Sequence, residues 1–368
     1  MTLVLIVIVV ALAFEYINGF HDTANAIATV VSTKVLTPRQ AVLMAATTNL
    51  LGAMWGTAVA QTIATGLIDV HLVAITSEVL ICALLGAIAW NLLTWWFGLP
   101  SSSSHALIGG LCGAALAASH NNWRVIVWSL PSNVHWYLGK GLLWKVIAPM
   151  ITSPVFGFLL SFCLMALLFG LLRNARPSRV SRFFRHAQIA SAGAMGLMHG
   201  TNDAQKTMGI MALALLGATQ TGQFEHLPAC LGFLRATIPL PGQHVEIPIW
   251  IKVLCALTMA SGTAVGGWRV IKTLGHKMVK LQPINGFAAE TSSAVVIFIA
   301  THLGIPVSTT HNISAAIMGV GSAKRLSAIR WTVVEQILWA WLLTIPVTAG
   351  TAYVLVHLLQ AFGWMSGG

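Results

Sequence analysis

The sequence predicts an all-α polytopic membrane protein, with about 10–12 transmembrane helices in two inverted repeats that contain broken or re-entrant helices. Three observations support this fold class. Hydrophobic residues make up 57% of the 368-residue chain and charged residues only 8%, whereas soluble domains carry about 25% charged residues. Apolar stretches long enough to cross a bilayer recur along the chain. Two polar motifs inside these stretches each occur twice.

Ten apolar segments are candidate membrane helices, because a crossing needs about 20 mostly apolar residues. They are roughly 2–30, 39–66, 77–98, 103–119, 146–172, 187–217, 247–267, 286–303, 308–322 and 331–359. Two of them, 103–119 and 308–322, are short, so both full crossings and re-entrant half-helices are open for them. The apolar N-terminal stretch has no basic flank and no small-residue cleavage site, so we expect a retained span rather than a secretory signal.

The basic residues predict the orientation of the chain. There are 20 Lys and Arg against 9 acidic residues, but most lie in short gaps between apolar segments, so we interpret them as topology signals and expect no nucleic-acid partner. If every segment crosses, 14 of the 20 fall on one side of the membrane: Lys34, Arg39, Arg173, Arg176, Arg179, Arg182, Arg185, Arg269, Lys272, Lys277, Lys280, Lys324, Arg325 and Arg330. The positive-inside rule places that side in the cytoplasm and both termini outside a plasma membrane, the inner membrane of a bacterium.

The polar motifs indicate an internal duplication. NGFHDTAN (18–25) has a counterpart in HGTNDAQK (199–206), and GLPSSSSH (98–105) has one in GIPVSTTH (304–311), in the same order. Each half then holds five segments, and an odd number of crossings turns the second half upside down in the membrane. Inverted repeats with paired broken helices are typical of secondary transporters, with the substrate site where the repeats meet.

The duplication also predicts the domain organisation. We expect a first repeat over 1–172, a basic cytoplasmic linker over 173–186 and a second repeat over 187–368.

The hydroxyl-rich motif predicts an anion site. Gly98 and Pro100 interrupt the helical pattern, and the serines that follow are good N-caps. A helix that starts there directs free N–H groups and the positive end of its dipole at the break, which suits phosphate or sulfate. Alternatively, the hydroxyls only cap a helix or bond a neighbouring one, but the duplication favours the anion site. Its expected ligands are Ser102, Ser103, Ser104, Ser308, Thr309 and Thr310.

The second motif carries Asp22 and Asp203, the two Asp residues inside predicted spans. An ionised carboxylate at membrane depth is costly, so it indicates a functional site. Asn25 and Lys206 follow three residues later and share a helix face with their aspartate, and we add both to the substrate-binding set. The alternative is an Asp–Asn or Asp–Lys pair that only satisfies itself.

An anion beside two carboxylates is repelled by several kcal/mol at reduced dielectric, so the site requires cations. Anion and cation then each favour the binding of the other, as symport requires. Asp22, Asp203 and Glu290 are the candidates for coupling to protons or another cation, while Glu15 and Glu78 are weaker candidates because both could lie near span ends. Four histidines flank the motifs, and each is at least as readily explained by a bond to a backbone carbonyl as by proton transfer: His21, His105, His199 and His311.

Taken together, the motifs resemble those of the inorganic phosphate transporter (Pit-type) family. The matching stretches are NGFHDTANA (18–26), HGTNDAQK (199–206), GLPSSSSH (98–105), GIPVSTTH (304–311) and GWRVIKTLG (267–275). The resemblance implies import of inorganic phosphate by symport through an inverted-repeat bundle. It is closest to the bacterial proton-coupled, low-affinity members, which implies phosphate carried as a neutral complex with a divalent metal.

The coupling ion has alternatives within this family: a sodium-coupled phosphate symporter or a proton-coupled sulfate symporter. Sodium-coupled members carry a Glu in the second span where this chain has Asn49, whereas Glu290 fits its partner in the second half. One of two symmetric carboxylates is therefore replaced, which argues against sodium.

Other classes fit less well. An intramembrane hydrolase would use a Ser, a His and an Asp, but the chain has no GxSxG elbow, and catalysis does not need a duplication. An anion channel needs no paired broken helices. The five cysteines form no CxxC and predict neither a disulfide frame nor a zinc site. We therefore expect no enzyme activity and no resident cofactor, with phosphate, protons or sodium, the lipid bilayer and a homo-oligomer as the possible partners.

Overall fold

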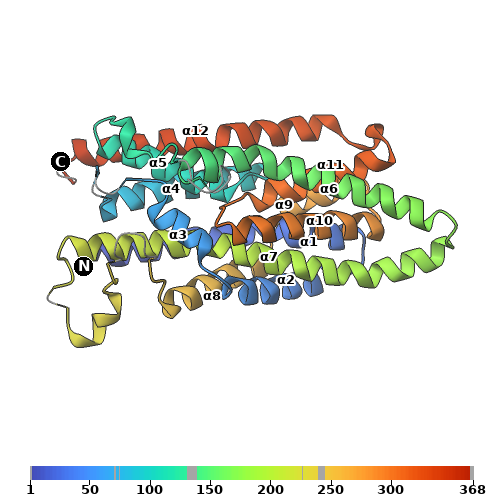
Figure 1. The fold of residues 1–368 in the computed structure, drawn as a ribbon, viewed down its shortest axis with the longest axis horizontal. Helices are drawn as coiled ribbons and strands as arrows, with labels where there is room; N and C mark the ends of the chain where they lie inside the picture. Colours follow the sequence, from blue (N-terminus) through green and yellow to red (C-terminus); the bar gives the residue numbers. More distant parts are fainter. Residues whose placement is uncertain are drawn as a thin grey trace.

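The structure is a computed structural model that describes residues 2–69, 72–73, 75–130, 139–225, 227–238 and 245–364. Its helices run side by side along the long axis of the molecule (Figure 1). All ten predicted segments are helical. The first half contains α1 (Thr2–Ser32), α2 (Pro38–Ala53), α3 (Ala58–Thr65), α4 (Ser77–Phe97), α5 (Ser103–Ala118) and α6 (Ala148–Leu172). The second contains α7 (Pro177–Gln220), α8 (Ile249–Val265), α9 (Trp268–Lys272), α10 (Pro283–His302), α11 (Thr309–Lys324) and α12 (Trp331–Ala361).

The helices differ in their capacity to cross a membrane. Five stretches of the described chain are long and apolar enough to do so alone: Thr2–Ser32, Ser77–Phe97, Leu143–Leu172, Pro283–His302 and Trp331–Ala361. Two bent pairs bring the number to seven if each is one span: α2 with α3, bent by 68°, and α8 with the stretch Trp268–Lys277, bent by 58°. The long helix α7 is interrupted by polar residues, which lowers its hydropathy. The fold is therefore the expected all-α membrane bundle.

The two ends of the bundle have different character. Figure 1 places both chain ends at one end of the long axis, the terminus end, and the α6–α7 connection at the other. Most of the basic residues lie toward this second end, the basic end, which comprises 34–39, 173–185, 276–280 and 324–330. Arg269 lies instead beside Trp96 and Gly98, at the break before α5. Arg185 bonds the carbonyl of Lys34 at 3.3 Å, and the Arg330 N–H bonds the carbonyl of Met278 at 3.1 Å.

The short helices α5 and α11 begin inside the protein. Each has 16 residues, or roughly 24 Å, which is less than the hydrocarbon thickness of about 30 Å. The chain turns into each through a glycine with positive φ, Gly98 at 65° and Gly304 at 62°. The two starts meet, because the Ser104 hydroxyl donates to the carbonyl of Val307 at 3.2 Å. This is the broken-helix arrangement that the sequence predicts.

Close helix contacts hold the rest of the bundle. α1 packs on α8 at Gly19 and Gly262, where any side chain would collide: a methyl group at Gly19 would lie 2.4 Å from the Met259 carbonyl oxygen, and one at Gly262 would lie 2.2 Å from that of Tyr16. The outer faces of α6 and α12 expose apolar side chains instead, as lipid contact requires. Examples are Leu171 at 70% and Leu342 at 62% exposed.

The order of elements is the same in both halves: a long helix, a bent pair, a helix that leads into a break, a short helix and a long apolar helix. The division into 1–172, 173–186 and 187–368 stays a prediction, and residues 177–186 of the predicted linker form the first part of α7.

Candidate functional site

The predicted binding residues come together where α1 and α7 pass the starts of α5 and α11. Asp22 and Asn25 belong to α1, and Asp203 and Lys206 to α7. The hydroxyl residues belong to the two broken segments. All are buried in the described structure, none more than 4% exposed: Asp22, Asn25, Ser102, Ser103, Ser104, Asp203, Lys206, Ser308, Thr309 and Thr310.

Asp22 is surrounded by hydrogen-bond donors from three elements. Its Oδ1 lies 2.6 Å from His21 Nδ1 and 3.3 Å from the Thr310 hydroxyl on α11. Its Oδ2 accepts from the Ser103 hydroxyl on α5 at 2.8 Å. The Ser103 hydroxyl is also 2.6 Å from Asn18 Oδ1, one turn earlier on α1. Asp22 therefore joins both broken segments.

Asp203 has a cationic partner on its own helix. The Lys206 ammonium forms an ion pair with Asp203 Oδ1, and Thr309 Oγ1 donates to Oδ2 at 2.9 Å. His199 Nε2 lies 3.0 Å from the same Oδ2. Lys206 also donates to the Ser104 hydroxyl and to the Val307 carbonyl at 3.0 Å. Its charge is thus shared between the carboxylate and the start of α5.

Asn25 occupies on α1 the place that Lys206 has on α7. Its Nδ2 donates to Thr310 Oγ1 at 2.9 Å and to Thr309 Oγ1 at 3.1 Å. Its Oδ1 is buried and has no hydrogen-bond partner among the described residues. The amide nitrogen of Asn25 is therefore directed at the start of α11, and its amide oxygen remains available to accept a hydrogen bond from a substrate.

The outer residues of the hydroxyl motifs are helix caps. Ser102 Oγ accepts from the His105 N–H at 3.2 Å, and Ser308 Oγ accepts from the His311 N–H at 3.1 Å. Capping holds each helix start in place, while the first N–H groups of a helix lack partners within it. The two helix starts thus present N–H groups, hydroxyls and positive dipole ends to one small region.

His199 points to a cation at this site. Asn49 Nδ2 donates to Thr263 Oγ1 at 2.9 Å, which fixes the amide, so Asn49 Oδ1 accepts from His199 Nδ1 at 3.1 Å. The Nε2 that faces Asp203 then carries a lone pair in the neutral ring. A lone pair 3.0 Å from a carboxylate oxygen is repelled by it unless a cation lies close by, and the Lys206 ammonium on the other oxygen of Asp203 is such a cation.

The geometry also allows a metal ion. Ligand atoms of Asp22, His199 and Asp203 all lie within 4.8 Å of one another. Two carboxylates and an imidazole suit a divalent transition metal, and the Asn49 contact supplies the outer hydrogen bond that usually orients such a histidine.

The structure does not bring Glu290 to this site. Glu290 bonds Thr29, Gln188 and Ser191, and Ser191 precedes Asp203 on α7 by twelve residues, or about 18 Å of helix. Glu290 therefore lies toward the basic end. Glu290 can take part in the predicted proton coupling only if protons are transferred between it and the aspartates of the site.

The two weaker acidic candidates also differ from each other. Glu78 lies in the first turn of α4 and is partly exposed, near a helix end as expected. Glu15 does not lie near an end: it is in the middle of α1 and 0% exposed. Glu15 lies three residues before the continuously buried part of α1, which runs from Asn18 to Val30, and the apolar start of the helix gave no sign of where this interior begins.

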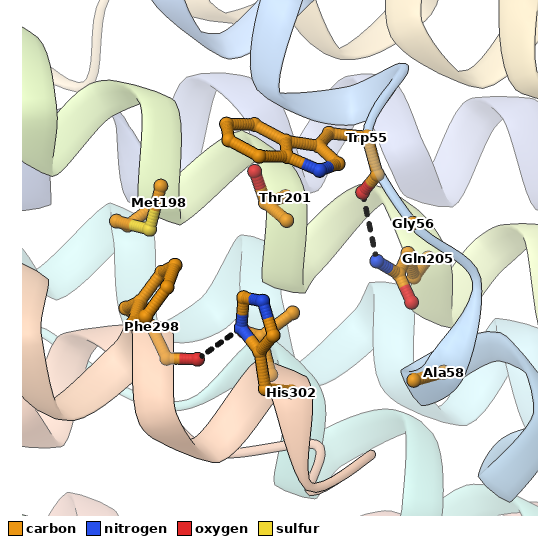
Figure 2. Close-up of a pocket in the computed structure, with 9 residues that line it drawn as sticks. Trp55, Gly56, Ala58, Met198, Thr201, Gln205, Phe298 and His302 are labelled. Atoms are coloured by element: carbon orange, nitrogen blue, oxygen red, sulfur yellow. Dashed lines mark hydrogen bonds between the residues drawn. The ribbon is translucent and has the colours of Figure 1, made fainter.

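A separate pocket lies beside α7, on another face of the helix (Figure 2). Met198, Thr201 and Gln205 line it together with Trp55 and His302. In it the Gln205 amide donates to the Trp55 carbonyl at 3.2 Å. Its described lining includes neither aspartate nor Lys206, so this pocket is not the site of the duplicated motifs.

Sequence reasoning missed Asn18 and Thr263 and named Asn49 only as a replaced carboxylate, although all three connect the site to the scaffold. Asn18, Asn49 and Thr263 are fully or almost fully buried and bond Ser103, His199 and Gly19. Buried amides within apolar segments were the available signal, since each must find a partner in the membrane.

A bundle of membrane helices with charged groups and the starts of broken helices buried at its centre is typical of secondary transporters. More specifically, the chain belongs to the phosphate transporter family, whose profile matches residues 18–352. The resemblance found in the motifs is thereby confirmed.

Individual relatives cover almost the whole chain. A Bacillus subtilis (strain 168) protein described as a probable low-affinity inorganic phosphate transporter is 40% identical over 360 residues, 97% of this chain and 98% of its own length. A Rhizobium meliloti (strain 1021) protein with the same description is 45% identical over 343 residues, 93% of this chain and 92% of its own. A solved structure described as the sodium-dependent phosphate transporter matches with a TM-score of 0.77 and 25% identity, over 98% of this chain and 100% of that one.

Proposed function

We propose that this protein imports inorganic phosphate by proton symport across a plasma membrane. The observation that carries the proposal is the meeting of all four duplicated motifs in one buried site. Hydroxyls and helix starts there suit a tetrahedral oxyanion, and Lys206 adds one positive charge. The family and the descriptions of its relatives in Bacillus subtilis and Rhizobium meliloti support phosphate rather than sulfate as this anion.

The charges explain why a cation must accompany the phosphate. Asp22 and Asp203 face one lysine, so an added phosphate creates an excess of negative charge in a low dielectric. A proton, or a metal ion held by Asp22, His199 and Asp203, removes that excess. Phosphate therefore enters together with compensating cations. These are either protons bound separately at the site or a metal ion in a neutral metal–phosphate complex.

Sodium coupling is the second candidate, because a matching solved structure is described as sodium-dependent. Proton coupling is favoured by Asn49, a neutral amide at the position where the resemblance of the motifs implies a Glu in sodium-coupled members. This amide is 0% exposed and committed to Thr263 and His199, so it adds no charge for a sodium ion.

The proposed orientation puts the basic end in the cytoplasm and the terminus end outside. The support is the concentration of Lys and Arg at the basic end, since such residues are retained in the cytoplasm. Inverted repeats would then expose the site to each side in turn.

The test is labelled phosphate uptake into liposomes that contain the purified protein. With an inward proton gradient and no sodium, we expect phosphate to accumulate inside, and we expect a tenfold excess of sulfate to compete weakly. Accumulation that requires a sodium gradient would replace the proton by sodium. Accumulation of sulfate, or no gradient-driven uptake at all, would overturn the proposal.

A further inference from the structure

Glu15 is a buried acid that the proposed phosphate site does not use. Its side chain is 0% exposed in the middle of α1. The Thr207 hydroxyl of α7 donates to Oε2, while Oε1 has no hydrogen-bond partner among the described residues. An ionised carboxylate held this way in a membrane is very costly. A proton on Glu15 removes that cost.

Glu15 lies on the same face of α1 as the substrate site. It precedes Asp22 by seven residues, and Asp22 precedes Thr29 by seven. Seven residues are close to two helical turns, so the three side chains are stacked about 10 Å apart along one face. Thr29 is in turn a hydrogen-bond partner of Glu290. Glu15, Asp22 and Thr29 thus follow one another along this face of α1, and Thr29 contacts Glu290 of α10.

The order of these acids follows the long axis. Since α1 starts at the terminus end (Figure 1), Glu15 lies between that end and the phosphate site. Glu290 lies between the site and the basic end. One buried acid therefore flanks the substrate aspartates on each side.

The neighbours of Glu15 favour a group that changes its charge. The titratable groups that act on it are Asp203 and Lys206 of α7 and Cys255 of α8. Thr207, which bonds Glu15, follows Lys206 directly in α7. A change of charge at the phosphate site therefore changes the electrostatic potential at the Glu15 carboxyl group. The Thr207 hydroxyl suits both states, because it donates to a carboxylate and accepts from a carboxylic acid.

We infer that Glu15 is a proton-binding site of the transport cycle, which takes a proton from water on the terminus side and passes it inward toward Asp22. An O–H bond forms on a Glu15 carboxylate oxygen as hydronium becomes water. That bond breaks when the proton is transferred to a water molecule on the side of the phosphate site. The 10 Å step to Asp22 requires water or a change of conformation. The inference rests on the proposed proton symport.

Glu15→Gln tests it, because glutamine has the shape of the protonated acid and cannot release a proton. In liposomes with an inward gradient of one pH unit, each coupled proton supports about tenfold accumulation. We expect Glu15→Gln to lose this accumulation, at least about tenfold, while exchange of labelled for unlabelled phosphate stays within about twofold of wild type. Exchange needs no proton release. Glu78→Gln is the matched control and should accumulate phosphate normally.

Thr207→Val provides a second measurement that keeps the Glu15 carboxyl group. The hydroxyl bonds both forms of Glu15, but its bond to the ionised form is the stronger. We therefore expect its loss to raise the pH of half-maximal uptake, and Thr207→Ser to restore it. Normal accumulation by Glu15→Gln, or an unchanged pH profile in Thr207→Val, would overturn the inference and leave the proposed function intact. Absence of gradient-driven uptake in the wild type would instead remove the proposed function, and this inference with it.

Discussion

The two aspartates of the site have equivalent hydroxyl partners, but only one of them is paired with a lysine. Ser103 donates to Asp22 Oδ2, and Thr309, its counterpart in the second hydroxyl motif, donates to Asp203 Oδ2. Asp203 has in addition the Lys206 ammonium. Asp22 has the neighbouring His21 instead, and no lysine or arginine pairs with it among the described residues.

The residues three positions after each aspartate show the same pattern. Asn25 donates to Thr310, and Lys206 donates to Ser104, again counterparts in the two motifs. The two motifs therefore share their hydrogen-bond geometry and differ in charge. The Asp203 carboxylate is paired with a lysine of the same helix, and under the proposed symport the Asp22 carboxylate would receive its cation together with the substrate.

The largest expected effect comes from removing each carboxylate in turn. We expect Asp22→Asn and Asp203→Asn both to abolish phosphate uptake with normal membrane insertion. They should differ in stability, because only Asp203→Asn leaves a buried ammonium without its counter-ion, at a cost of about 3–5 kcal/mol. Thermal unfolding in detergent measures this difference. Equal destabilisation by the two variants, or wild-type uptake by either, would contradict the comparison.

A smaller effect is expected from Lys206→Asn, which gives the second motif the residue of the first. A hydrogen bond from a charged donor contributes about 1.5–3 kcal/mol, so its loss should weaken phosphate binding by roughly 10- to 100-fold. Phosphate titration of the purified protein is the measurement, and Lys252→Asn, a partly buried lysine near the start of α8, is the control. Unchanged affinity in Lys206→Asn would exclude the lysine from phosphate binding.

The smallest effect distinguishes caps from ligands. If the Ser102 and Ser308 hydroxyls serve as caps, Ser102→Ala and Ser308→Ala should each lower the free energy of unfolding by about 0.5–2 kcal/mol and leave phosphate affinity within about twofold. Ser103→Ala, which removes a donor to Asp22, should weaken affinity more than either. A larger loss of affinity in Ser102→Ala would instead make its hydroxyl a direct phosphate ligand.

The sequence predicted the helices well because apolar length is a property of a local stretch. It did not predict the bends between α2 and α3 and between α8 and α9, although Gly56 and Gly266 there have positive φ angles of 81° and 79°. Both glycines lie within apolar sequence that reads as one continuous span. A bend depends on backbone conformation and on neighbouring helices, which hydropathy does not report.

The site was predictable to the extent that the motifs repeat. The duplication predicted that Asp22, Asp203 and the hydroxyl residues belong together, and the structure places them in contact. It did not predict the location of Glu15 or Glu290, because neither acid has an acidic counterpart in the other half. Their positions depend on which helix packs against which, and only the folded bundle determines that.

The contact of Gly19 with Gly262 has a consequence for natural variation. Neither glycine has a side chain that could bind a ligand, yet a single added methyl group at either would force apart α1 and α8, and α1 carries Asp22 and Asn25. Harmful substitutions in this protein should therefore include residues with no chemistry of their own. A survey of inactive variants that looked only for polar residues would overlook them.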